Sequence, residues 1–257
     1  MIDKTAQIAP TAYIGENVTI GKDVKIMHCA YLEHCEIGAG TVIYPFASIG
    51  SAPQDLGYKG EVTKVIIGEN CQIREYVTVN RASGEGEVTK VGDRCLLMAY
   101  SHVAHNCVLE DEVIMANVAT IGGHVWIGKG AFLGGLSVFH QNIRIGEMAI
   151  ISGASAARMD ILPYAKSEGA PCVPIGLNAI GLKRRGIIAQ DREAINQAIR
   201  LLKSENLNTT QAVAEIEKTV KMNDYVRNII EFVKTSKRGV TLKSNKNFRQ
   251  ITEENDG

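Results

Sequence analysis

An aliphatic residue returns every six positions along most of the chain before Pro163, and glycine often follows it. The longest unbroken block runs through Val91, Leu97, Val103, Leu109, Met115, Ile121, Ile127, Leu133, Phe139, Ile145, Ile151 and Ala157. A period of six matches neither the 3.6-residue period of an α-helix nor the simple alternation of a long strand. It is the period of the hexapeptide β-helix, with three hexads in each triangular coil. The sequence therefore predicts a mainly β fold, a parallel β-helix of seven to eight coils from residue 8 to about residue 162.

A second column of small or branched residues follows each aliphatic position by four residues. Several cysteines belong to this column, and no CxxC pair occurs, so a zinc ribbon or a thioredoxin-type motif is not indicated. Aromatic residues make up only 5% of the chain, which suits a solenoid whose coils contact only their neighbours. We expect the six cysteines to be small buried thiols: Cys29, Cys35, Cys71, Cys95, Cys107 and Cys172.

Two insertions interrupt the hexads, roughly at residues 54–65 and 82–90, and loops of this kind on a rigid solenoid commonly carry function. The repeat ends after Pro163. Beyond it, amphipathic helices are predicted over residues 191–205, 209–221 and 224–236, with Thr209 or Thr210 as N-cap of the second. The predicted domains are a β-helix at 1–162 and a helical domain at 163–257.

The charge balance restricts the class of protein. Lys and Arg number 28 and Asp and Glu also number 28, so the excess of cations typical of a general nucleic-acid binder is missing. No run of about 18 apolar residues occurs, so no stable membrane insertion is expected. The first residues contain no apolar signal-peptide core, and we expect a cytoplasmic protein.

Residues 18 positions apart should occupy the same place on adjacent coils, about 4.8 Å apart. Two such columns are rich in polar residues: His105, Gly123 and Gln141 in one, and Asn106, His124 and Asn142 in the next. This grouping suggests a general base, His105, beside an open backbone N–H at Gly123. The alternative is a set of surface histidines that hydrogen-bond across coils.

Two further groups of residues have competing interpretations. His102, His105 and His124 resemble part of a zinc site, but a corner separates the first two and no acidic or cysteine ligand completes the set, so no metal is expected. The basic run at 183–185 is either a solvated cluster or a docking site for phosphate or an acidic carrier protein.

Several motifs together resemble the UDP-N-acetylglucosamine O-acyltransferase family over nearly the whole chain. They are IDKTAxIxPTA at 2–12, FASIG and PQDL within 46–56, IREYVT at 73–78, HVAHNC at 102–107, GGHV at 122–125, the His140–Gln141 pair, LPY at 162–164 and NAIGLKRRG at 178–186. The resemblance implies a left-handed coil and a homotrimer with active sites between β-helices. It also implies transfer of a β-hydroxyacyl group from acyl carrier protein to the 3-hydroxyl of UDP-N-acetylglucosamine, the first step of lipid A synthesis. No separate cofactor is implied, because 4'-phosphopantetheine arrives on the carrier.

The resemblance also implies a role for each matching residue. For the chemistry, His105 is the general base, Gly123 supplies the oxyanion donor, and Asn106 stands beside the base. For the UDP-sugar, the resemblance implies that Gln54 and Asp55 hold the sugar and its phosphates, that Asn178 and Arg184 contact the nucleotide, and that the cleft is lined by His102, His124, His140 and Gln141. For the acyl donor, Lys183 and Arg185 dock the carrier and Gly153 leaves room for a long acyl chain.

Three departures from the family pattern keep alternatives open. Asn106 stands where the family usually has Asp, Gly57 stands where many members have Lys, and the N-terminus is about one coil shorter than usual. N-acylation of the 3-amino analogue of UDP-N-acetylglucosamine therefore stays an alternative. Others are an acetyl-CoA-dependent hexapeptide acetyltransferase, a β-helical zinc carbonic anhydrase and a non-catalytic scaffold. The KRRG run and the long helical segment argue against the acetyltransferase.

Overall fold

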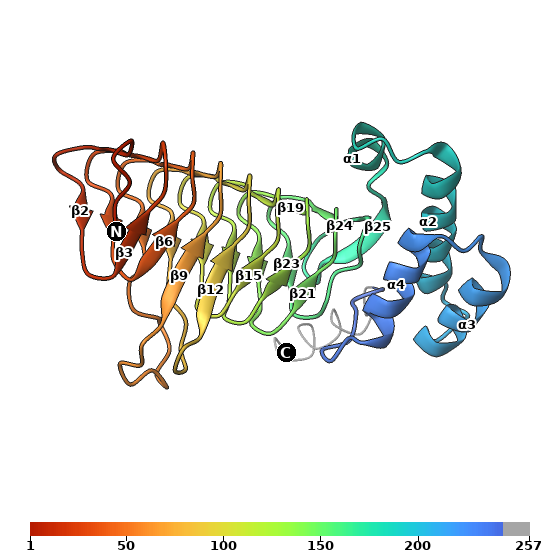
Figure 1. The fold of residues 1–257 in the computed structure, drawn as a ribbon. Coiled ribbons are helices and arrows are strands. Elements are labelled where there is room, and N and C mark those ends of the chain that lie inside the picture. Colours follow the sequence, from red (N-terminus) through yellow and green to blue (C-terminus); the bar gives the residue numbers. More distant parts are fainter. Residues whose placement is uncertain (244–257) are drawn as a thin grey trace, which may run out of the picture.

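The computed structural model describes residues 1–243 as a three-sided solenoid of short strands followed by helices (Figure 1). The first sheet contains β1 (Gln7–Ile8), β4 (Lys25–Ile26), β7 (Val42–Ile43), β10 (Gln72–Ile73), β13 (Leu96–Leu97), β16 (Ile114–Met115), β19 (Phe132–Leu133), β22 (Ile150–Ile151), β24 (Ala165–Glu168) and β25 (Val173–Leu177). The second contains β2 (Tyr13–Ile14), β5 (Tyr31–Leu32), β8 (Ser48–Ile49), β11 (Thr78–Val79), β14 (His102–Val103), β17 (Thr120–Ile121), β20 (Val138–Phe139) and β23 (Ala156–Ala157). The third contains β3 (Val18–Ile20), β6 (Cys35–Ile37), β9 (Lys64–Ile67), β12 (Val88–Val91), β15 (Val108–Leu109), β18 (Trp126–Ile127) and β21 (Arg144–Ile145).

Apart from the final antiparallel pair β24–β25, successive strands of each sheet pair in parallel, and through the long block they do so with the register that the hexads predict. In the long block each residue pairs with the one three hexads later, as His102 does with Thr120. The spacing grows by one hexad between Thr78 and His102 and by two hexads between Ser48 and Thr78, because each insertion lengthens one coil. The predicted parallel β-helix is confirmed.

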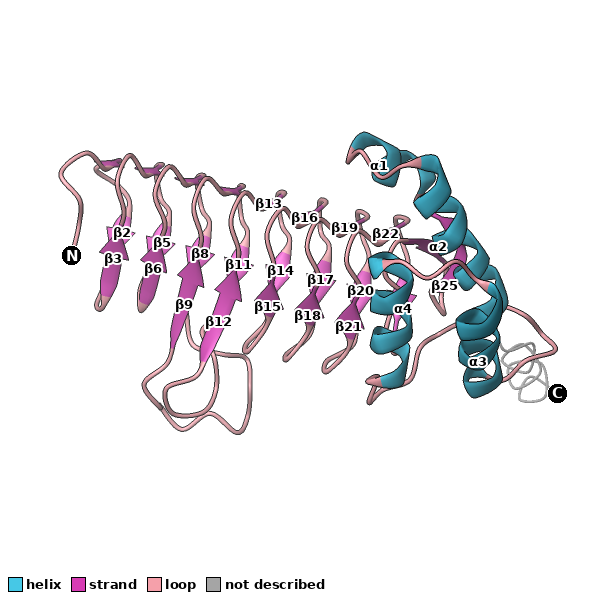
Figure 2. Ribbon diagram, turned by 45° about the vertical axis from the view of Figure 1, so that its right-hand side comes forward, coloured by secondary structure: helices cyan, strands magenta, loops and turns pink. Residues whose placement is uncertain are grey.

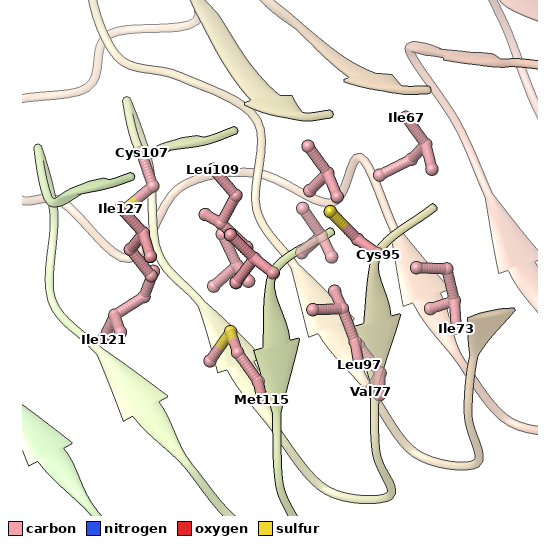
Figure 3. Packing of buried hydrophobic residues seen from close by; sticks show 14 of the residues in the cluster. Ile67, Ile73, Val77, Cys95, Leu97, Cys107, Leu109, Met115, Ile121 and Ile127 are labelled. Atoms are coloured by element: carbon pink, nitrogen blue, oxygen red, sulfur yellow. The ribbon is translucent and has the colours of Figure 1, made fainter. Parts of the chain in front are cut away.

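The core of the solenoid consists of the two predicted inward columns. The aliphatic positions from Val91 to Ile151 are at most 4% exposed, and Figure 3 shows such residues stacked coil upon coil. Five of the six cysteines are buried, as predicted. The prediction was wrong for Cys29, which is exposed: it occupies a corner position with φ 59°, where the side chain points away from the core.

Two loops project from one edge of the solenoid beneath β9 and β12 (Figure 2). They comprise residues 50–63 and 80–87, and we call them the first and second loops. The second is shorter than the predicted insertion because residues 88–91 form β12, which pairs with β9 along its whole length. The longer strands give both loops a rigid base.

Four helices follow the solenoid: α1 (Ala179–Arg184), α2 (Ala189–Leu202), α3 (Thr209–Thr219) and α4 (Asp224–Lys234). Helix α1 was not predicted. The N-cap of α3 is Asn208 rather than Thr209 or Thr210, because Asn208 and Gln211 form a reciprocal capping box. Within residues 1–243, none of the helices combines the length and apolarity needed to cross a membrane.

Candidate active site

The three corners of the solenoid differ in character, and each takes its name from residues that it carries. The histidine corner, between the second and third sheets, comprises residues 104–107, 122–125 and 140–143. The aromatic corner, between the first and second sheets, comprises residues 44–47, 74–77, 98–101, 116–119, 134–137 and 152–155. The charged corner, between the third and first sheets, comprises residues 92–95, 110–113, 128–131 and 146–149.

His105 and Asn106 lie next to each other on the histidine corner. The Nδ1 atom of His105 is 2.9 Å from the Oδ1 atom of Asn106. Asn106 adopts a left-handed conformation, φ 57°, which asparagine tolerates better than most residues, and its N–H donates to the Oγ1 of buried Thr89 at 2.9 Å. The imidazole of His105 is thus held by the residue that follows it in the chain.

Gly123 lies one coil away from His105, directly against the imidazole. A β-carbon at this position would be 2.5 Å from Nε2 and 2.6 Å from Cε1 of His105, so any side chain would displace the ring. No acceptor within residues 1–243 receives a hydrogen bond from the Gly123 N–H. An imidazole nitrogen that accepts a proton and a free N–H that stabilises an oxyanion are the two groups that acyl transfer needs.

Charge near the imidazole comes from Asp55 of the first loop. Hydrogen bonds from the Gly57 N–H and then the Ser83 side chain lower the pKa of Asp55, and His105 and His124 favour its ionised form. Burial and then the neighbouring His105 lower the pKa of His124, whose ring meets that of His105 edge-on with centroids 5.2 Å apart. Asp55 therefore stays a carboxylate beside two imidazoles.

Other predicted cleft residues lie on the same side of the solenoid. His102 is half-buried on β14, with Nδ1 2.7 Å from the Thr78 hydroxyl. His140 and Gln141 are exposed on the next coil beyond Gly123, and Arg238 comes within 3.2 Å of the His140 Nδ1. Gln54 is exposed at the start of the first loop.

The predicted nucleotide and carrier residues of α1 lie on a different corner from His105. The Asn178 side chain caps α1 by accepting from the Gly181 N–H, and it donates to the Met148 carbonyl on the charged corner. Arg185 forms an ion pair with Glu112 on that corner, at 2.5 Å. The structure therefore does not bring Asn178, Lys183, Arg184 and Arg185 to His105 within one chain.

Gly153 lies on the aromatic corner and is exposed. Its nearest neighbour is the Gly135 carbonyl, which would be 3.1 Å from a β-carbon at position 153. The same corner carries a ridge of exposed apolar residues in left-handed conformations: Phe46, Tyr76, Tyr100, Val118 and Leu136. The three aromatic rings stack in parallel, with centroids 4.8 to 4.9 Å apart.

Sequence reasoning missed the residues that anchor the loops. Arg81 is 13% exposed and lies 3.2 Å from the Glu33 carboxylate, and it donates to the Gly50 carbonyl and to the Tyr58 hydroxyl. Ser83 of the second loop bonds the Asn106 side chain through its backbone. No periodic signal marks either residue, because both belong to the second loop, where the hexads are interrupted.

The zinc interpretation finds no cluster of ligands. Across residues 1–243, no three side chains of His, Cys, Asp or Glu are grouped closely enough to hold a metal ion. One of the three histidines in question, His102, directs its Nδ1 to Thr78 instead.

Comparisons with known proteins show the family to which the chain belongs. A family model described as "Udp N-acetylglucosamine O-acyltransferase; Domain 2" matches residues 160–241, and a model of the GMPPB C-terminal domain matches residues 1–100. A curated relative from Thermodesulfovibrio yellowstonii is named acyl-[acyl-carrier-protein]–UDP-N-acetylglucosamine O-acyltransferase. It is 41% identical over 241 residues, which cover 93% of each chain. The chain belongs to the UDP-N-acetylglucosamine O-acyltransferase family.

Other members of the family support the assignment. A relative with the same name from a Synechocystis species is 46% identical over 201 residues, 78% of this chain and 72% of the relative. The crystal structure of the UDP-N-acetylglucosamine acyltransferase from Bacteroides fragilis matches with a TM-score of 0.82 and 36% identity, covering 93% of this chain and 99% of that one. The Acinetobacter baumannii structure matches with a TM-score of 0.79 and 31% identity, covering 94% and 99%. The family and the fold that the sequence motifs predicted are both confirmed.

Proposed function

We propose that this family member transfers a β-hydroxyacyl chain from acyl carrier protein to the 3-hydroxyl of UDP-N-acetylglucosamine, the first step of lipid A synthesis, with His105 as general base. The observation that carries the proposal is the direct approach of the His105 ring to the Gly123 backbone, with no side chain between them. A base and an oxyanion donor so placed can act on one reacting carbonyl. We also propose a cytoplasmic location, as the sequence predicts.

In the proposed reaction, the sugar hydroxyl gives its proton to Nε2 of His105 while its oxygen attacks the thioester carbon. The resulting tetrahedral oxyanion accepts a hydrogen bond from the Gly123 N–H, an interaction worth about 3 kcal/mol in comparable sites. The intermediate then collapses, the carbon–sulfur bond breaks, and the imidazolium returns the proton to the pantetheine sulfur. Asp55, whose pKa is lowered first by the Gly57 N–H hydrogen bond, stays a carboxylate near this site.

We propose that the working unit is a homotrimer. His105 and Gly153 lie on different corners of one chain, so an acyl chain that uses both fits best where the aromatic corner of one subunit meets the histidine corner of the next. The exposed ridge on the aromatic corner supports this contact, because contiguous exposed apolar residues mark protein interfaces. A contact between unlike surfaces closes into a ring when the rotation fits.

The proposed docking of acyl carrier protein uses the basic end of α1. Lys183 and Arg184 occupy its last turn and form no ion pair with residues 1–243, whereas Glu112 engages Arg185. A cation without an ion-pair partner attracts an acidic carrier more strongly than a cation whose charge is neutralised by a carboxylate. Lys183 therefore carries most of the proposed docking and Arg185 contributes less, while Arg184 keeps its proposed contact with the nucleotide.

A mass-spectrometric assay tests the function. The purified protein is mixed with β-hydroxyacyl carrier proteins of several chain lengths and with UDP-N-acetylglucosamine or its 3-amino analogue. Acylated UDP-N-acetylglucosamine should form with the native protein and not with His105→Ala. Exclusive acylation of the amine would establish the N-acyl alternative. Consumption of acetyl-CoA instead would establish the acetyltransferase alternative. If no product forms with any donor, the non-catalytic scaffold is the remaining alternative.

A further inference from the structure

The backbone of Ser83 forms two hydrogen bonds with the side-chain amide of Asn106, one to its oxygen and one from its nitrogen. The Ser83 N–H donates to the Asn106 Oδ1 at 2.9 Å, and the Asn106 Nδ2 donates to the Ser83 carbonyl at 3.0 Å. Exchanging the amide oxygen and nitrogen by a flip would oppose two donors on one side and two acceptors on the other. The second loop therefore fixes which way the Asn106 amide points.

This orientation determines the protonation of His105. The atom that faces the His105 Nδ1, at 2.9 Å, is the Asn106 Oδ1, which can only accept. Nδ1 must therefore carry the hydrogen, and in the neutral imidazole the lone pair is on Nε2. Nε2 is the ring atom nearest to where a Gly123 side chain would be, so the basic nitrogen lies against the backbone of Gly123.

These two hydrogen bonds with Ser83 also account for asparagine at a position where the family usually has aspartate. In serine proteases, replacing the orienting Asp by Asn lowers the rate about 10⁴-fold because the wrong tautomer results. Here the Ser83 N–H holds the amide oxygen toward the histidine and avoids that outcome. An aspartate would lose the donor to the Ser83 carbonyl and place a carboxylate oxygen against it.

We propose that the backbone of Ser83, acting through Asn106, is a positioning element that sets the catalytic tautomer of His105. This inference rests on the proposed function for its catalytic meaning, but the tautomer itself is a property of the free protein. The second loop then has a role beyond connecting β11 to β12, because its backbone orients the base through Asn106.

The first test is NMR of the full chain with ring-labelled histidine at neutral pH. The His105 signals are assigned as those that disappear from the spectrum of His105→Ala. They should show that the ring hydrogen is on Nδ1. A hydrogen on Nε2 overturns the proposal. This measurement requires no activity, so the tautomer can be as proposed even if the acylation assay fails, and the two failures are distinguishable.

The second test compares variants at position 106 with a matched control at Asn142, which lies two coils further along the same column, also left-handed with φ 61°. In Asn106→Ala the hydrogen of His105 should no longer be confined to Nδ1. We expect kcat to fall at least 100-fold, with each KM changed less than about threefold. Asn106→Asp, unlike Asn106→Ala, keeps an oxygen acceptor for the Nδ1 hydrogen. It should therefore retain the Nδ1–H tautomer and most of the native kcat, with a pH–rate profile moved to higher pH. Asn142→Ala should leave both readouts unchanged. Equal losses for Asn106→Ala and Asn106→Asp, or an unchanged tautomer in Asn106→Ala, would contradict the proposal.

Discussion

The imidazole of His105 fills the space that a side chain at Gly123 would need: a β-carbon there would lie 2.5 Å from Nε2. The two residues are three hexads apart and stack on adjacent coils, so the spacing of the solenoid itself sets their separation. Neither residue can change without affecting the other.

Replacing Gly123 by alanine should therefore inactivate the enzyme without unfolding it. The added methyl group pushes the imidazole away from the free N–H, and we expect kcat to fall at least 100-fold, the scale of losing an oxyanion donor. The melting temperature should change little, because the imidazole can turn outward. Steady-state acyl transfer and thermal unfolding check this, with Gly176→Ala as control, since a β-carbon at Gly176 meets nothing within 4 Å. Retention of full activity by Gly123→Ala would exclude the proposed oxyanion site.

Arg81 should control the position of the first loop. Its guanidinium connects Gly50 and Tyr58 in that loop to Glu33 of the solenoid. Arg81→Gln removes the cation from a mostly buried pair, a loss of about 3 kcal/mol in comparable cases, and loosens the loop that carries Asp55. We expect KM for the UDP-sugar to rise about tenfold and KM for the acyl carrier protein to stay near its native value.

The control for Arg81 is Arg74→Gln. Arg74 pairs with Glu75 and covers the Tyr44 ring, neither of which belongs to a loop, and its side chain is 39% exposed. This variant should match the native enzyme in both KM values and in the rate of proteolysis of the first loop. A normal UDP-sugar KM in Arg81→Gln would mean that the loop holds its position without the arginine.

The regular part of the fold was predictable because each hexad repeats the same local choice. The inward side chain of Ile121 stacks on that of Val103 one coil away, and the period fixes both their register and their burial. The cap of α3 was predictable in principle, because Asn208 has Gln211 three residues later and Thr209 has no such partner. The prediction overlooked that signal.

The loop contacts could not be predicted in the same way. Ser83 meets Asn106 across 23 residues, and their approach depends on how the second loop folds back over β12 rather than on any period. The same holds for Arg81, whose partner Glu33 is 48 residues distant. The sequence predicted that His105 and Gly123 lie together because both belong to the regular coils, and it gave no sign of the contact between Ser83 and Asn106.

Stability should fall on the acid side partly through His102. Burial, and then the charge of His105, lower the pKa of His102, so the fold favours its neutral form. Between that lowered value and the ordinary value near 6.5, the unfolded chain binds more protons, so stability decreases as pH falls. His102→Gln should make the decrease in melting temperature from about pH 7 to about pH 5 shallower. The same substitution at exposed His28 should leave the slope unchanged, and equal slopes for His102→Gln and the native protein would refute the assignment.

Gly153→Met should shorten the acyl chain that the enzyme prefers. The glycine is exposed on the aromatic corner, and a long side chain there would block an acyl chain lying along it. Competition among β-hydroxyacyl carrier proteins of different lengths measures the preference. Gly153→Ala separates chain length from folding, because its β-carbon already meets the Gly135 carbonyl at 3.1 Å. An unchanged preference in Gly153→Met would remove Gly153 from the acyl site.

Mixed trimers should show that one site uses two chains. His105→Ala trimers should form no product, and Gly153→Met trimers should form only short-chain product. When the two variants are co-expressed, some sites combine His105 from one chain with Gly153 from its neighbour, and long-chain product should reappear. If both residues of a site came from the same chain, every mixed site would lack either the base or the glycine. Light scattering that reports a monomer, or mixtures that never yield long-chain product, would therefore exclude the proposed contact between the aromatic and histidine corners.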